Sequence, residues 1–189
     1  MTNPKRAILL RGKEKSLSRK HPWIFSGALK SKDKDIEEGD LVRVFSSEGE
    51  FLCIGHWQNG SIAVKVLSFE NERIDYGFVL ERIRTAVELR QTIGMFTDKD
   101  TTIFRLVNGE GDFMPSLIAD YYDGLVVVQF HSIGMYLLKE EIVQALKEIL
   151  QDNCKAIYCK SSSTLPKQEG IIAKDEFMFG TLEEDWYAL

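Results

Sequence analysis

The sequence has little cysteine and little histidine, with three of each among 189 residues. Cys53, Cys154 and Cys159 are odd in number and form no pair at the spacing of metal ligands, and the histidines are scattered. These patterns exclude a zinc site and a disulfide framework. We therefore expect no bound metal and three free thiols that are mostly buried.

Long apolar runs are also absent. No run approaches the roughly 20 residues that span a bilayer, and the first apolar run, residues 7–10, is too short for the core of a signal peptide. We therefore expect a cytoplasmic protein with no membrane partner. Four prolines and 44% hydrophobic residues indicate a globular chain with a buried core.

Charge is distributed unevenly along the chain. The formal net charge is -5, yet residues 1–34 hold ten Lys and Arg against two acidic residues, a net charge of +8. Residues 70–189 hold twelve basic and twenty-one acidic residues, a net charge of -9. A basic segment in an otherwise acidic protein is typical of a face that binds a polyanion.

Within residues 11–29 this basic segment runs directly into aromatic residues. The cationic side chains would contact phosphates and supply affinity, while the aromatic rings would stack on the bases. RNA is therefore the first ligand to consider. The candidate RNA-binding residues are Arg11, Lys13, Lys15, Arg19, Lys20, His21 and Trp23. Two alternatives stay open: a solvated helix face followed by an ordinary strand, and a protein-interaction domain whose basic strip meets an acidic partner.

Hydrophobic periodicity predicts a first domain, residues 1–70, built almost entirely of strands. Short apolar or alternating runs separated by turn residues indicate a compact β-module with one basic helix at 14–20. The strands are predicted at 7–11, 23–25, 41–45, 51–57 and 62–67.

The pattern changes at Asp75, a good N-cap, and residues 71–189 mix helices with strands. Helical spacing predicts helices at 76–92 and 135–150, and Asp123-Gly124 is a hairpin signal. Strands are predicted at 103–107, 116–121, 125–131, 155–159 and 171–179. This order favours a small α/β sandwich, so the fold class is α+β.

A second cluster of polar residues lies on a glycine-rich loop between two predicted strands. Its candidate substrate-cleft residues are Arg105, Glu110, Asp112 and Asp120. Carboxylates on such a loop can bind metal, transfer protons, touch a substrate or simply cap a turn. With no histidine or nucleophile nearby, we assign no catalytic residue. We expect the loop to face a cleft, and the loss of Glu110 or Asp112 to change stability little.

The glycines of this loop do not form a nucleotide-binding turn. Gly109 and Gly111 lack the third glycine and the following helix of a dinucleotide-binding motif. We therefore expect no cofactor in this chain.

The residues from Gly12 to Gly27 resemble the start of a known family. They match the pattern Gly-x-Glu-Lys-Ser-Leu, then Arg-x-His-Pro-Trp-Ile-Phe-Ser-Gly, of the N-terminal PUA domain of bacterial large-subunit rRNA methyltransferases that make 5-methylcytidine. The glycine-rich loop resembles a motif of the family's central α/β domain, with Phe113 and Ser116 where the family has glycine, and residues 167–170 resemble a later element.

The resemblance implies a class I, S-adenosylmethionine-dependent enzyme. In the family a further Rossmann domain binds this cofactor and carries the catalytic cysteine, and no such pattern is present here. The resemblance thus implies a PUA-like β-barrel and an α/β sandwich without a Rossmann domain. It implies a substrate-recognition portion of an rRNA (cytosine-C5) methyltransferase that binds 23S rRNA, with S-adenosylmethionine needed by a full-length parent. The alternative is a free-standing RNA-binding protein without methyltransferase activity.

Overall fold

The computed structural model describes residues 4–98 and 100–181 and divides into two compact units. The first unit holds the residues up to Arg73 together with Ser132–Leu137. The second holds Ile74–His131 and the residues from Leu138 onward. The first unit therefore includes a short segment from much later in the chain.

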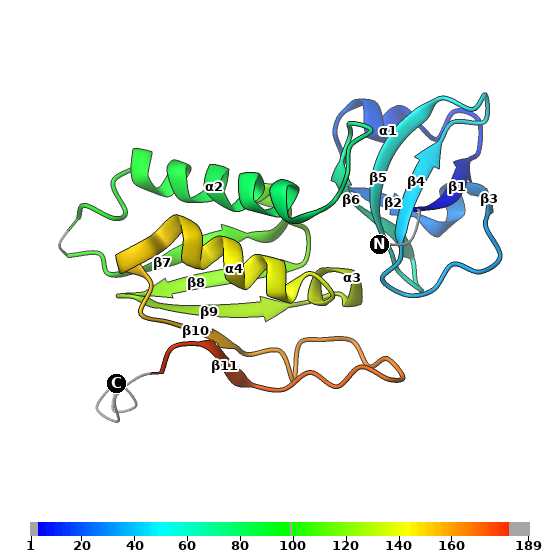
Figure 1. Ribbon diagram of the computed structural model, residues 1–189. Helices are drawn as coiled ribbons and strands as arrows, with labels where there is room; N and C mark the ends of the chain where they lie inside the picture. Colours follow the sequence, from blue (N-terminus) through cyan, green and yellow to red (C-terminus); the bar gives the residue numbers. More distant parts are fainter. Residues whose placement is uncertain (1–3, 99, 182–189) are drawn as a thin grey trace. The chain divides into compact units, whose positions relative to one another are not determined.

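The first unit is a six-stranded sheet that curls around its own core (Figure 1). The strand order is β2-β6-β5-β4-β1-β3, in which β1 pairs with β4 in parallel and the other pairs are antiparallel. Its strands are β1 (Lys5–Leu9), β2 (Trp23–Phe25), β3 (Leu29–Lys32), β4 (Leu41–Phe45), β5 (Phe51–Trp57) and β6 (Ile62–Ser68). The short helices α1 (Lys15–Ser18) and η1 (Ser26–Ala28) flank β2.

Helix α1 has a single turn, shorter than the predicted helix at 14–20, because the chain closes it early. The N–H of Lys20 donates to the carbonyl of Leu17 at 2.8 Å, and the N–H of His21 donates to Ser16 at 3.1 Å. This pair of bonds is a Schellman motif, which places Lys20 in the left-handed region at φ 59°. The motif ends the helix and turns the chain into β2.

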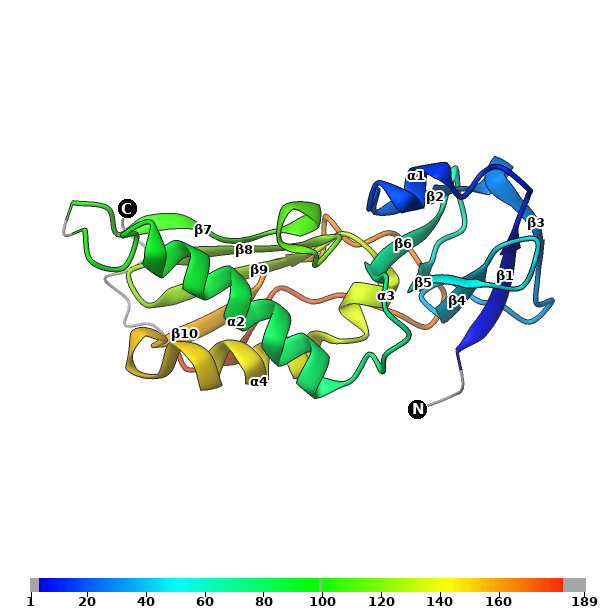
Figure 2. The same ribbon diagram turned by 90° about the horizontal axis from the view of Figure 1, so that it is seen from above.

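The second unit is a five-stranded sheet in the order β11-β10-β9-β8-β7. Strands β9 and β10 are parallel and the other neighbours are antiparallel. The strands are β7 (Ile103–Asn108), β8 (Leu117–Tyr122), β9 (Leu125–Phe130), β10 (Ala156–Cys159) and β11 (Glu176–Phe179). Helices α2 (Tyr76–Thr92) and α4 (Lys139–Leu150) lie side by side on one face of the sheet (Figures 1 and 2). The 3-10 turns η2 (Gly109–Asp112) and η3 (Gln151–Asn153) complete the unit.

Local sequence signals explain the clearest elements of this unit. The Asp75 carboxylate caps α2 by accepting the N–H of Phe78 at 3.3 Å, and α2 has the predicted bounds. At the β8–β9 turn, Asp123 and Gly124 have φ of 43° and 101°, the left-handed pair of a tight hairpin. Both predictions are confirmed.

Besides α1, other elements differ from the sequence prediction. Strand β1 starts at Lys5 and ends at Leu9 rather than spanning 7–11. Strand β3 was not predicted because its side chains are mostly polar and exposed. Strand β11 starts at Glu176 rather than at 171. The helix expected at 135–150 is two helices, α3 (Ile133–Tyr136), capped by Ser132, and α4. The break allows the buried residues of α3 to join the core of the first unit.

The three cysteines are free and buried, as predicted. Burial raises the pKa of Cys53 to about 12 and that of Cys154 to about 11, so neither thiol is a ready nucleophile. Within residues 4–98 and 100–181, no three His, Cys, Asp or Glu side chains gather as a metal site would require. In the same residues no helix has the length and apolar character to cross a membrane.

His56 on β5 is buried against α3, and we expect it to make stability depend on pH. A Cβ at Gly134 would lie 2.3 Å from the His56 ring, and burial lowers the pKa of His56 to about 4. Between about pH 6.5 and 4 the unfolded chain therefore binds a proton that the folded chain does not. The free energy of unfolding should fall as pH falls through this range.

Urea unfolding at pH 7.5 and pH 5 checks this, with His56→Gln removing the titrating group and His21→Gln as the exposed control. The loss of stability at pH 5 should be smaller in His56→Gln than in the other two chains. Equal losses in all three would contradict it.

Candidate nucleic-acid interface

One surface pocket of the first unit is built entirely from residues 9–28. Its volume is about 380 Å³, and its walls come from β1, α1, β2 and η1. The lining residues are Leu9, Lys13, Ser16, Leu17, His21, Trp23, Ile24, Phe25, Gly27 and Ala28. Leu9, Leu17 and Ile24 are core residues, so the pocket has an apolar floor and a polar rim.

The predicted RNA-binding residues fall into two groups around this pocket. Lys13, His21 and Trp23 line it, while the others lie on α1 and its flanks with exposed side chains. The Arg11 guanidinium is 4.0 Å from the Glu48 carboxylate, and both side chains are largely exposed, so the pair contributes little to stability. Cationic groups therefore remain available to solvent beside the pocket.

Two of the rim residues hold each other in place. The His21 Nδ1 lies 3.2 Å from the backbone nitrogen of Trp23 and 3.3 Å from its carbonyl oxygen. When Nδ1 carries the proton it can donate to the Trp23 carbonyl, and when it does not it can accept from the Trp23 N–H. The two rings meet edge to face with centroids 5.9 Å apart. This geometry fixes both rings at the mouth of the pocket.

Sequence reasoning missed Ser16, Phe25 and Gly27, which also line the pocket. A signal for Phe25 was present, because residues two apart on a strand share a face and Trp23 was already a candidate. Phe25 is 51% exposed, so its ring is accessible to a ligand.

In the second unit the structure brings Arg105 and Asp120 together on neighbouring strands. The Arg105 Nε donates to the Asp120 carboxylate at 2.9 Å, and this hydrogen bond raises the pKa of Arg105. Both residues line a hollow of about 550 Å³. The remaining lining residues are Arg90, Ile103, Phe104, Asn108 and Tyr122. Glu110 is half-buried and is not among them.

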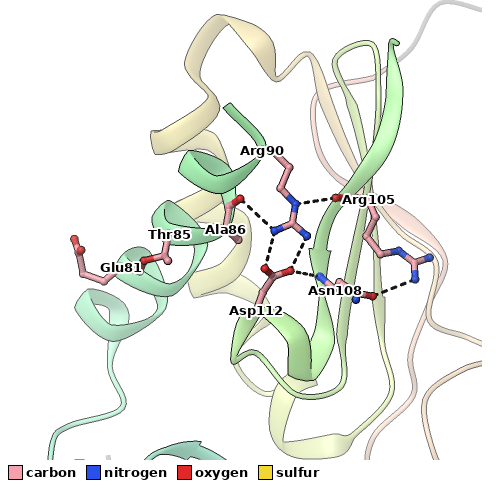
Figure 3. A network of polar contacts seen from close by, with 7 residues as sticks. All are labelled: Glu81, Thr85, Ala86, Arg90, Arg105, Asn108 and Asp112. Atoms are coloured by element: carbon pink, nitrogen blue, oxygen red, sulfur yellow. Dashed lines mark hydrogen bonds and ion pairs between the residues drawn. The ribbon is translucent and has the colours of Figure 1, made fainter. Parts of the chain in front are cut away.

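Asp112 is not a lining residue, but it forms a buried ion pair with Arg90, which does line the hollow (Figure 3). The guanidinium donates to the two carboxylate oxygens at 2.6 and 2.8 Å, and the side chains are 11% and 6% exposed. The carboxylate also accepts the N–H of Asn108 at 2.6 Å. The expectation that Asp112 forms no bonds with nearby groups is therefore wrong. Arg90 was the missed signal, an arginine at a core position of the α2 pattern.

Two residues of the glycine-rich loop that are not glycine adopt the left-handed conformation. Phe113 has φ 56° and Ser116 has φ 72°. A side chain in this region costs about 1–2 kcal/mol relative to glycine. The loop therefore has a left-handed backbone, which glycine adopts most readily, at both Phe113 and Ser116, and this lowers the stability of the fold.

The same loop does not fit a nucleotide cofactor. Gly109 and Gly111 lie in η2, and the next element is strand β8 rather than a helix whose N-terminus could receive a phosphate.

Comparison with known proteins matches residues 7–69 to the family described as PUA-like domain. This part of the chain is therefore a PUA-like domain. The match contains every strand of the first unit except the first two residues of β1, and it contains the pocket.

Over most of its length the chain is homologous to proteins named ribosomal RNA large subunit methyltransferase I. It is 34% identical to the protein of Erwinia tasmaniensis over 168 residues, which are 88% of this chain and 41% of the relative. It is 36% identical to the protein of Alteromonas mediterranea over 166 residues, 87% of this chain and 41% of the relative. The chain thus spans about two fifths of the length of these relatives.

A solved structure shares the fold of the chain. It is a candidate SAM-dependent methyltransferase from Streptococcus mutans, with a TM-score of 0.77 and 17% sequence identity. The likeness covers 94% of this chain and 44% of that one. The mixed α/β architecture with a PUA-like domain is therefore a known arrangement.

We predict that the Arg90–Asp112 pair is a main support of the second unit. Asp112→Ala would leave the guanidinium buried without its partner and should lower the free energy of unfolding by about 3 kcal/mol or more. The matched control is Asp120→Ala, which breaks the more exposed pair with Arg105 and should cost less than about 1 kcal/mol. Urea unfolding of both variants measures this. Equal losses would show that Asp112 contributes no more than a surface pair.

We also predict that backbone strain at Lys20 is measurable. Glycine adopts φ 59° freely, so Lys20→Gly should be about 1 kcal/mol more stable than Lys20→Ala. Both variants lose the contact of the Lys20 ammonium with the Phe69 ring, which lies 4.6 Å away, so that loss cancels in the comparison. Thermal unfolding gives the difference. If the alanine variant is as stable as the glycine variant, the motif carries no strain at this residue.

Proposed function

We propose that the PUA-like domain binds RNA through the face formed by α1, β2 and the pocket between them. The observation that carries the proposal is the coincidence of three features in residues 9–28: the pocket, the cationic side chains and the family-like motif. Lys15 and Arg19 are exposed and adjoin in the chain the pocket residues Ser16 and Leu17, and Trp23 and Phe25 line the same pocket. Cations beside rings suit phosphates attached to stackable bases.

We further propose that the chain is the substrate-recognition portion of an S-adenosylmethionine-dependent rRNA methyltransferase. The names of the homologues support rRNA of the large subunit as the substrate. Methylation at cytosine C5 and 23S rRNA as the partner rest on the resemblance of residues 12–27. A cytoplasmic location rests on the lack of long apolar runs and on the bacterial homologues. Residues 1–70 would be the RNA-binding domain and residues 71–189 the central domain. No residue is assigned a catalytic or cofactor-binding role.

The Arg105–Asp120 hollow would then help to position RNA rather than perform chemistry. Its paired charges and the rings of Phe104 and Tyr122 offer hydrogen bonds and stacking, but no nucleophile. The alternative, a free-standing RNA-binding protein, uses the same face and differs only in lacking methyl transfer.

The proposal predicts that Arg19 and Lys20 contact phosphates. Arg19→Ala with Lys20→Ala should weaken binding to a 23S rRNA fragment and flatten the slope of log K against log salt by up to about two units. Filter binding at several salt concentrations gives the slope.

The control removes the same charge elsewhere, through Arg84→Ala with Lys174→Ala on the second unit. This variant should keep the wild-type slope. If the Arg19 and Lys20 variant keeps the wild-type slope of log K against log salt, the proposed binding face is wrong.

A further inference from the structure

We propose that the pocket of the PUA-like domain holds a single unpaired base of the RNA, so that the protein selects RNA in which one base is free of a duplex. This inference rests on the proposed RNA-binding function and adds the structural class of the substrate. The volume of about 380 Å³ is near the lower end of the range for small-ligand sites, roughly 300–1,000 Å³. Such a pocket suits one base rather than a stack of several.

The lining favours a base over a phosphate. Leu9, Leu17 and Ile24 form a floor that is at most 4% exposed, and a phosphate against this floor would lose its hydration without gaining donors. A planar base instead gains contact with the floor and with the rings of Trp23 and Phe25. The chemistry of the interior is therefore that of an aromatic, uncharged group.

The rim supplies what the rest of the nucleotide needs. Lys13 lines the pocket, and Lys15 and Arg19 are exposed close by in the chain. When the base of a nucleotide enters the pocket, the phosphate of that nucleotide would lie near these cationic side chains. Ser16 and His21 add polar groups that can bond the edge of the base. A base held in a helix by its pairing partner cannot enter such a pocket, whereas a bulged or looped base can.

Gly27 gives a direct way to test the pocket. It lines the pocket, its φ lies outside the left-handed region, and a Cβ built on it would meet no atom within 4 Å. A larger side chain at this position should therefore fold without strain and occupy the space. Gly60 has the same open surroundings and is not a lining residue, so it provides the matched control.

The experiment uses two RNA hairpins of equal length, one fully paired and one with a single bulged 2-aminopurine. The wild-type chain and Gly60→Leu should bind the bulged hairpin more tightly and change its fluorescence. Gly27→Leu should bind it roughly 10-fold more weakly, the loss expected for one stacked base, and should lose the fluorescence change. Its affinity for the paired hairpin and its salt slope should stay at the wild-type values.

Phe25→Ala is a second variant. The Phe25 ring is half-exposed, so its removal should leave the fold intact. This variant should also reduce the preference for the bulged hairpin. Wild-type preference in both Gly27→Leu and Phe25→Ala would overturn the base pocket. An equal affinity of the wild-type chain for the two hairpins would overturn it as well, while leaving RNA binding intact. Failure of the wild-type chain to bind either RNA would instead refute the proposed function itself.

Discussion

The buried ion pair between Arg90 and Asp112 holds together three parts of the second unit. Arg90 belongs to helix α2, Asp112 ends η2, and the pair bonds the backbone of β7 at the carbonyl of Arg105 and the N–H of Asn108. Strand β7 is at the edge of the sheet. The ion pair therefore occupies two backbone groups of an edge strand. Helix, loop and sheet edge are thereby fixed by one contact.

This arrangement explains how a loop with two strained residues keeps a defined shape. Phe113 and Ser116 oppose the loop conformation by their positive φ, and the Asp112 bonds oppose its unwinding. Arg105 sits on β7 directly beside the anchored backbone, so its side chain is presented to Asp120 from a rigid strand. Through Arg90, Asp112 thus supports the strand that carries Arg105.

Sequence patterns located α2, the Asp123-Gly124 hairpin and most strands because those elements follow from local capping, periodicity and turn chemistry. Three of the candidate residues, Lys13, His21 and Trp23, line the pocket, since cationic and aromatic residues cluster within one short segment. The break between α3 and α4 and the burial of Asp112 depend on partners far away in the chain. Such contacts leave no local pattern in the sequence, apart from Arg90, a charged residue at an otherwise apolar position of the α2 periodicity.

The return of the chain to the first unit at α3 has a topological consequence. Gly39 and His56 pack directly against Ile133 and Gly134, so a few residues located after β9 complete the interior of a sheet formed by the first 73 residues. The first unit is therefore discontinuous. A single cut after Arg73 would not release a finished domain, because it would remove the piece that covers the His56 ring and leave that part of the interior open to water.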